Sequence, residues 1–197
     1  MFVVLEGPSA AGKSTWAARW PAGSVVAETG PVEVPTTLDV DEIAQTWADL
    51  DARRWSTAVA TEAVTGLAVC DTDPLKLHYS YCLARVDAGD WAVFDAGVLV
   101  CRRAIAEQRL GIADLVACWI PDDATLAAQR EADVTRGRRN FALHRRLAGP
   151  LRDWYEALAA LDPARVVGQF PDLVDDVAVR DRYDVDLLDA WMAGLPR

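Results

Sequence analysis

A glycine-rich segment near the amino terminus constrains the fold more than any other part of the chain. The residues from Phe2 to Leu5 form a short apolar run, residues 7–14 read G-P-S-A-A-G-K-S, and a helix-like stretch begins at Lys13. The pattern G-x-x-x-x-G-K-[ST] between a strand and a helix predicts a loop whose backbone N–H groups surround phosphate oxygens. The alternative is a glycine-rich turn that binds nothing, but the position of the segment between strand and helix favours phosphate binding.

Each part of this loop has a predicted role. Lys13 is expected to reach the β- and γ-phosphates and to act in catalysis, and the Ser14 hydroxyl is expected to bind Mg²⁺. The pattern therefore predicts ATP and Mg²⁺ as cofactors. The predicted nucleotide-binding residues are Gly7, Ser9, Ala10, Ala11, Gly12, Lys13, Ser14 and Thr15.

The rest of the chain alternates between short apolar runs and helical patterns. Further strands are predicted at residues 24–27, 67–70, 115–120 and 165–167, and helices at residues 39–65, 75–86, from about 124, and at 153–161. This alternation is typical of an α/β three-layer sandwich with a mostly parallel five-stranded sheet, here in one domain spanning residues 1–197. Residues 91–100 are expected to form a turn or short extended piece before a helix that ends near Gly111. The acidic tail from Asp172 is expected to carry one or two helices.

Composition and charge exclude several other classes of protein. The formal net charge of −10 disfavours general binding to the phosphate backbone of nucleic acids, which needs a basic surface. The four cysteines are at least 12 residues apart, without a C-x-x-C pair, which argues against zinc and against a disulfide scaffold. No apolar run approaches the roughly 18 residues of a membrane span, and the first residues lack a basic signal region. We therefore expect a cytoplasmic protein with neither nucleic-acid nor membrane partners.

Three acidic residues follow predicted strands, namely Glu28, Asp71 and Asp73. Because ligands of open α/β sheets bind at the carboxyl ends of the strands, these carboxylates are candidates for the site. Asp71 is expected to bind Mg²⁺ together with Ser14 or to act in catalysis, and Asp73 is expected to contact the second substrate. The alternative is that these acids cap helices, above all Asp73, which precedes a proline.

The residues that flank the loop read V-V-L-E-G at positions 3–7 and G-K-S-T at positions 12–15. This opening resembles P-loop kinases of the thymidylate kinase and deoxynucleoside kinase group, in which an acidic residue precedes the first glycine. Glu28 followed by Pro31-Val32 is similar to the end of their second strand, and the resemblance implies that Glu28 is the base toward a substrate hydroxyl. Residues 71–73 fall where that group has an acid–arginine pair, and this chain has no arginine there.

The segment from Arg130 to Asp153 is basic although the chain is acidic. It contains seven arginines and three acids, a local charge of +4. It follows the fourth predicted strand, where small-molecule and nucleotide kinases carry a lid, and we expect an arginine-rich lid at about residues 130–146. Arg130, Arg136 and Arg138 are predicted to bind γ-phosphate oxygens in catalysis through their guanidinium groups. The alternative, a solvated helix face, is favoured for three others: Arg145, Arg146 and Arg152.

The helix predicted at residues 39–65 contributes the remaining candidates. A helix in this position borders the acceptor site in kinases of this layout. Either Trp47 or Trp55 is a candidate for lining an acceptor pocket, although packing is the favoured role for both. Arg54 or its neighbour Arg53 is a candidate for binding a monophosphate. The predicted substrate-binding residues are thus Glu28, Trp47, Arg54 and Asp73.

Together these features predict an ATP-dependent kinase that transfers the γ-phosphoryl group to a hydroxyl of a small molecule, foremost a nucleoside, a nucleoside-like metabolite or an antibiotic. Two alternatives stay open: a nucleoside monophosphate kinase, and a nucleotide-binding switch without an acceptor. The D-x-x-G and N-K-x-D patterns of regulatory GTPases are absent from the sequence, which favours transfer to a second substrate. The expected partners are ATP and the acceptor, with a homodimer as a further expectation.

Overall fold

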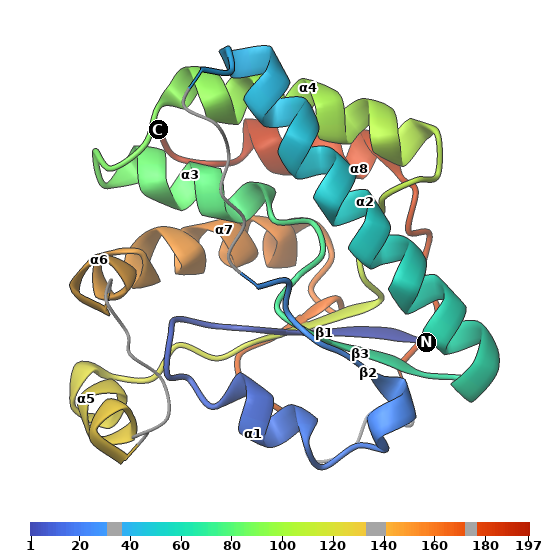
Figure 1. Ribbon diagram of the computed structural model, residues 1–197, viewed down its shortest axis with the longest axis vertical. Helices are drawn as coiled ribbons and strands as arrows, with labels where there is room; N and C mark the ends of the chain where they lie inside the picture. The colour runs from blue at the N-terminus through green and yellow to red at the C-terminus, as the bar shows by residue number, and fades with distance from the viewer. Residues whose placement is uncertain (31–36, 133–140, 172–176) are drawn as a thin grey trace.

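A five-stranded sheet forms the centre of the computed structural model, which describes residues 1–30, 37–132, 141–171 and 177–197. Every strand pairs with its neighbours in parallel, in the order β2-β3-β1-β4-β5 (Figure 1). The strands are β1 (Phe2–Glu6), β2 (Val25–Val26), β3 (Ala68–Asp71), β4 (Leu115–Cys118) and β5 (Val166–Val167). The prediction of a parallel five-stranded α/β sheet is confirmed.

Helices cover both faces of the sheet, but unequally. Helix α1 packs on one face, below the strands in Figure 1, and α2, α3, α4, α7 and α8 lie on the other. Helices α5 and α6 lie on the side where β1 ends, at the left of the picture. The α-helices within the described ranges are α1 (Lys13–Ala17), α2 (Val40–Thr65), α3 (Leu77–Arg85), α4 (Trp91–Ala106), α5 (Asp123–Ala132), α6 (Phe141–Arg146), α7 (Ala148–Leu161) and α8 (Val185–Ala193).

Alternation along β1 assigns its side chains to the two faces. Phe2 and Val4 belong to the large core beneath the five helices, whereas Val3 and Leu5 belong to a smaller core with Trp16 of α1. Because successive side chains of a strand point to opposite faces, both helical layers pack against the same strand. All five residues of β1 are consequently buried, as expected for the central strand of a covered parallel sheet.

Helix α2 has the ends that its sequence predicts. Asp39 precedes it and accepts a hydrogen bond from the backbone N–H of Glu42, whose side chain in turn accepts one from the N–H of Asp39. Gly66 ends the helix with a φ of 78°, a left-handed conformation that glycine adopts without steric cost. Both signals are local, which is why they are readable from the sequence.

Residues 91–100 are helical, so the expectation of a turn or extended piece there is wrong. The side chain of Asp90 caps α4 by accepting a hydrogen bond from a backbone N–H of the first turn at 2.8 Å. Phe94, Cys101 and Ile105 then recur at helical spacing on the face that packs into the large core.

The other differences concern element lengths. Helix α7 begins at Ala148, before the predicted start at Asp153. Helix α1 ends at Ala17, although the helix-like sequence that begins at Lys13 predicts a helix to Trp20, where Pro21 follows. The tail carries one helix, α8, within residues 177–197. Nowhere in the described ranges is a helix long and apolar enough to cross a membrane.

A buried ionic cluster closes the amino edge of the sheet. The fully buried carboxylate of Asp114 accepts hydrogen bonds from Phe2 N at 2.8 Å and from Arg182 Nε at 2.9 Å. Arg182 also donates to Glu62 of α2 at 2.6 and 2.7 Å, and these hydrogen bonds hold the pKa of Glu62 down at about 2. One guanidinium thus joins the C-terminal segment to β1 and α2.

We predict that Arg182→Met destabilises the fold by about 3 kcal/mol, because it leaves the buried Asp114 carboxylate without its cation. The measurement is the free energy of unfolding from urea denaturation. Arg102→Met is the matched control, since it removes an ion pair with Asp189 whose side chains are 46% and 45% exposed, and such pairs contribute little. Equal losses in the two variants would contradict the role assigned to the cluster.

Candidate functional site

The loop of residues 7–12 curls tightly at the carboxyl end of β1. Gly7 has a φ of 154°, and a Cβ on it would lie 2.3 Å from the backbone oxygen of Trp119, so only glycine fits beside the end of β4. Ala10 and Gly12 are left-handed as well, with φ values of 77° and 83°. Left-handed residues in such a loop turn neighbouring N–H groups to one side and so create a hollow suited to anions.

Lys13 extends back over this loop. Its Nζ donates hydrogen bonds to the backbone oxygen of Gly7 at 2.6 Å and to that of Pro8 at 3.3 Å. An ammonium group has three donors, so these two carbonyls leave one donor for a phosphate oxygen. The ammonium charge is therefore placed at the loop itself, as the sequence motif predicts.

Ser14 and Asp71 meet although they are 57 residues apart in the sequence. The Ser14 hydroxyl donates a hydrogen bond of 2.6 Å to Asp71 Oδ2, because β1 pairs with β3 and thereby places Asp71 beside Leu5. A hydroxyl and a carboxylate are oxygen ligands suited to Mg²⁺, which takes few ligands from protein and completes its shell with water and phosphate. Within the described ranges, no group of three or more acids, histidines or cysteines is placed to hold a metal ion.

Glu6 ties the loop to the turn that follows β3. Its carboxylate is buried, with Oε1 accepting a hydrogen bond from Gly7 N at 2.8 Å and Oε2 accepting one from Asp73 N at 3.1 Å. The ring of His78 lies behind it, with Nε2 3.4 Å from Oε2. The sequence resemblance singles out an acid at this position, and the structure gives its physical role.

Asp73 lies inside the protein, behind the loop. It is 3% exposed, and its carboxylate accepts hydrogen bonds from Leu75 N at 2.9 Å and from the Tyr155 hydroxyl at 3.1 Å. Burial and the neighbouring charge of Glu6 raise the pKa of Asp73 to about 7. Both carboxylate oxygens thus serve the fold, and the expectation of substrate contact through Asp73 has no support from this placement.

Arg54 is buried as well, and its guanidinium binds backbone oxygens. It donates to Ala27 O at 3.1 Å, to Asp71 O at 2.5 Å and to Thr72 O at 2.7 Å. These bonds hold the ends of β2 and β3 together and support Thr72, whose φ of 77° is unusual for a β-branched residue. We expected Arg54 to bind a monophosphate, but the structure places its guanidinium on main-chain carbonyls instead.

Glu28 lies just after β2 and pairs with Lys76, with 2.8 Å between Oε1 and Nζ. Burial alone would raise the pKa of Glu28, but the ion pair with Lys76 and the charges of Lys13 and Arg54 outweigh it and lower the pKa. Glu28 is therefore a carboxylate at neutral pH, and it lies within the electrostatic reach of the loop lysine.

His144 of α6 adjoins the same space. Burial lowers its pKa, and the charges of Lys13 and Lys76 lower it further against the opposing effect of Glu28. Its ring meets the ring of Tyr79 edge to face, with 6.4 Å between centroids. Sequence reasoning selected neither Lys76 nor His144, although Lys76 follows the strand-end acids by only a few residues.

The remaining predicted residues are spread more widely. Ser14 and Thr15 are exposed at the start of α1, and Trp47 is 40% exposed on α2. Arg130 belongs to α5, and only its backbone is described. Arg136 and Arg138 lie outside the described residues, so the lid expected at about residues 130–146 stays a prediction.

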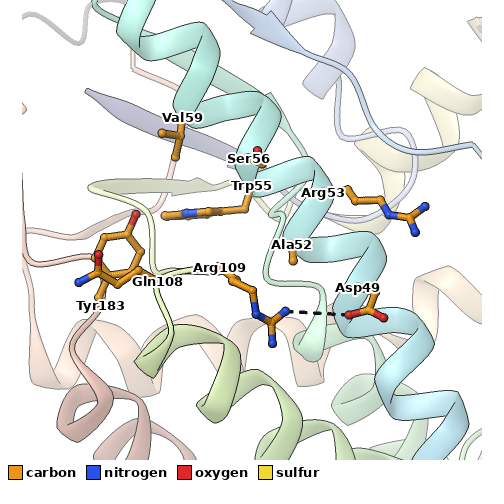
Figure 2. Close-up of a pocket in the computed structure, with 9 residues that line it drawn as sticks. All are labelled: Asp49, Ala52, Arg53, Trp55, Ser56, Val59, Gln108, Arg109 and Tyr183. Atoms are coloured by element: carbon orange, nitrogen blue, oxygen red, sulfur yellow. Dashed lines mark ion pairs between the residues drawn. The ribbon is translucent and has the colours of Figure 1, made fainter.

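A cavity of about 580 Å³ lies elsewhere, between α2 and the link from α4 to β4 (Figure 2). Trp55 lines it and stacks on Phe2 at the start of β1, so the cavity lies toward the amino edge of the sheet, away from the loop. Arg109 at its wall is paired with Glu107 at 2.8 Å and faces Asp49 at 4.0 Å. The lining residues, which include the alternative candidates Arg53 and Trp55 but none of the other predicted site residues, are Asp49, Ala52, Arg53, Trp55, Ser56, Val59, Gln108, Arg109 and Tyr183.

No protein-family model matches the chain, and none of the curated proteins matches it either. Any proposal about function therefore rests on the geometry of the loop of residues 7–12 and of the Ser14–Asp71 pair.

Asp51 of α2 fixes the backbone at Lys76. Its Oδ2 accepts a hydrogen bond from Lys76 N at 3.1 Å, at the start of α3. Asp51 is 7% exposed, and burial raises its pKa to about 7. Its carboxyl group therefore binds a proton more tightly in the folded protein than in the unfolded chain.

We predict that Asp51→Asn weakens the dependence of stability on pH. The pKa of Asp51 is about 7 in the folded protein and about 4 in the unfolded chain. Its contribution to the free energy of unfolding is therefore complete below pH 4 and is lost as the pH rises through 7. Urea unfolding at several pH values between 4.5 and 8 should show a shallower decline for Asp51→Asn than for the wild type. Asp73 contributes a decline of the same sign, so some slope remains. Identical slopes in both proteins would rule out the raised pKa of Asp51.

Proposed function

We propose that this protein is an ATP-dependent kinase that transfers the γ-phosphoryl group to a hydroxyl group of a small molecule. One observation carries the proposal, namely that Lys13 lies over the loop carbonyls while the Ser14 hydroxyl meets Asp71 at 2.6 Å. A loop that only turns the chain has no need of a lysine over it or of a carboxylate beside its serine.

In the proposed reaction the loop N–H groups and Lys13 bind the triphosphate at the carboxyl edge of the sheet. Mg²⁺ held by Ser14 and Asp71 neutralises charge on the phosphate oxygens when it is bound. The hydroxyl oxygen of the acceptor forms a bond to the γ-phosphorus, while the bond from that phosphorus to the bridging oxygen breaks and its electron pair leaves with ADP. The hydroxyl proton passes to Glu28.

The lowered pKa of Glu28 is compatible with this role. The transition state of phosphoryl transfer is loose in most cases, so little proton removal is needed early and the carboxylate mainly orients the hydroxyl. A nucleotide switch without an acceptor would not require a carboxylate beside the loop lysine. The position of Glu28 therefore supports transfer over switching.

The charges near Glu28 favour a hydroxyl acceptor over a monophosphate. A monophosphate needs its own cation, and Arg54 uses its guanidinium on three backbone oxygens. Among the described residues, this placement of Arg54 supports an acceptor without a phosphate of its own, with nucleosides, sugars and aminoglycoside-like alcohols as candidates.

We predict ADP release that depends on an acceptor in a screen of nucleosides, nucleotides, sugars and aminoglycoside-like alcohols, with a phosphorylated product visible by mass. Lys13→Ala should lower the rate at least ~100-fold, because it removes the loop cation from the phosphates. Glu28→Gln should lower kcat about 100-fold and leave binding of a nonhydrolysable ATP analogue unchanged, because the carboxylate acts on the acceptor.

Lys13→Ala serves as the blank of that screen. Turnover by Lys13→Ala at the wild-type rate would refute the proposed function. Full activity of Glu28→Gln would refute only the assignment of the base.

A further inference from the structure

Lysine is almost absent from this chain, and both of its lysines lie at the candidate site. Of the 20 Lys and Arg residues, only Lys13 and Lys76 are lysine, and the other 18 are arginine. Lys76 Nζ is 2.8 Å from Glu28, and the charge of Lys13 also reaches Glu28. A chain that uses arginine for every other cation therefore retains lysine in one place, near the carboxylate of Glu28.

Lysine and arginine do different work at such a site. The guanidinium of arginine is a rigid planar fork, whereas the ammonium of lysine is a compact point charge with three donors on a flexible stem. A compact cation can stay close to a phosphoryl oxygen while that group moves from one partner to the other. Arginine forms ion pairs elsewhere in the chain, so an ion pair alone does not explain a lysine at position 76. A phosphoryl group that moves between two partners does explain it.

Among the described cations near Glu28, Lys76 is the one placed to exchange its partner. Arg54 is 7% exposed and donates three hydrogen bonds to backbone oxygens, and Lys13 is held on the loop. The side chains of Lys76 and Glu28 are 29% and 45% exposed, and a pair so open to water is easily exchanged. The Lys76 backbone, in contrast, is fixed through the hydrogen bond to Asp51.

We infer that Lys76 is a second catalytic lysine, which leaves Glu28 and binds the oxygens of the phosphoryl group as that group is transferred. The inference rests on the proposed kinase function. As the acceptor oxygen bonds to the γ-phosphorus and the bridging oxygen leaves with ADP, the ammonium neutralises charge on the group in transit. Its departure frees the Glu28 carboxylate to accept the hydroxyl proton. The arriving phosphoryl group thus draws Lys76 away from Glu28 and leaves the Glu28 carboxylate ready to act as the base.

The test needs no knowledge of the acceptor. Mg·ADP with aluminium fluoride imitates the phosphoryl group in transit, and Mg·ADP alone imitates the product. By titration calorimetry, Lys76→Gln should bind the aluminium fluoride complex at least ~30-fold more weakly than the wild type, because a donor to that group is lost. Its affinity for Mg·ADP should stay within about twofold, since Lys13 and the loop bind the remaining phosphates.

Two further variants separate this role from a structural ion pair. Lys76→Arg can still pair with Glu28, so its thermal stability should match the wild type, but its affinity for the aluminium fluoride complex should remain reduced. Arg85→Gln, at the far end of α3, breaks a partly exposed pair with Asp153 and should change neither affinity. Wild-type affinity for the complex in Lys76→Arg, or in Lys76→Gln, would overturn the inference while leaving the kinase proposal intact. Failure of the wild type to bind Mg·ADP would overturn both.

Discussion

Two hydrogen bonds to the buried carboxylate of Glu6 hold the loop of residues 7–12 to the rest of the candidate site. One comes from Gly7 N, where the loop begins, and the other from Asp73 N, where the turn after β3 ends. Because Glu6 is the last residue of the central strand, its side chain fixes loop and turn relative to the sheet and to each other. The meeting of Ser14 and Asp71 depends on this arrangement and on the parallel pairing of β1 with β3.

The arginines and lysines of the described residues have different places, which follow from the shapes of their charged groups. Arg165 is buried and donates to backbone oxygens at the amino edge, where Arg182 joins two carboxylates, and Arg54 does similar work at the carboxyl edge. A planar fork is suited to such fixed sets of acceptors. Lys13 and Lys76 instead present compact point charges near Glu28. The acidic chain thus uses rigid cations for architecture and flexible ones beside the proposed reaction.

Local signals made much of the fold readable from the sequence. The strand, loop and helix around Lys13 and the two ends of α2 depend on residues a few positions apart. The first part of helix α4 was missed because residues 91–101 are apolar at nearly every position, so the helical spacing of the buried Phe94 and Cys101 is visible only once the core is known. Arg54 was misassigned because a guanidinium binds a carbonyl oxygen as readily as a phosphate. Lys76 gave no signal, since its partner Glu28 is 48 residues away in the sequence.

The Arg54 clamp has a consequence for how substrates could be discriminated. Its hydrogen bonds to Ala27 O and Asp71 O join the end of β2, next to Glu28, to the end of β3, where the proposed Mg²⁺ ligand Asp71 lies. The two strand ends therefore form one rigid unit. The backbone positions next to Glu28 and at Asp71 are therefore fixed relative to each other. In the proposed reaction this pair would act as a molecular ruler, which selects acceptors by the span between their hydroxyl group and the phosphate bound at Ser14 and Asp71.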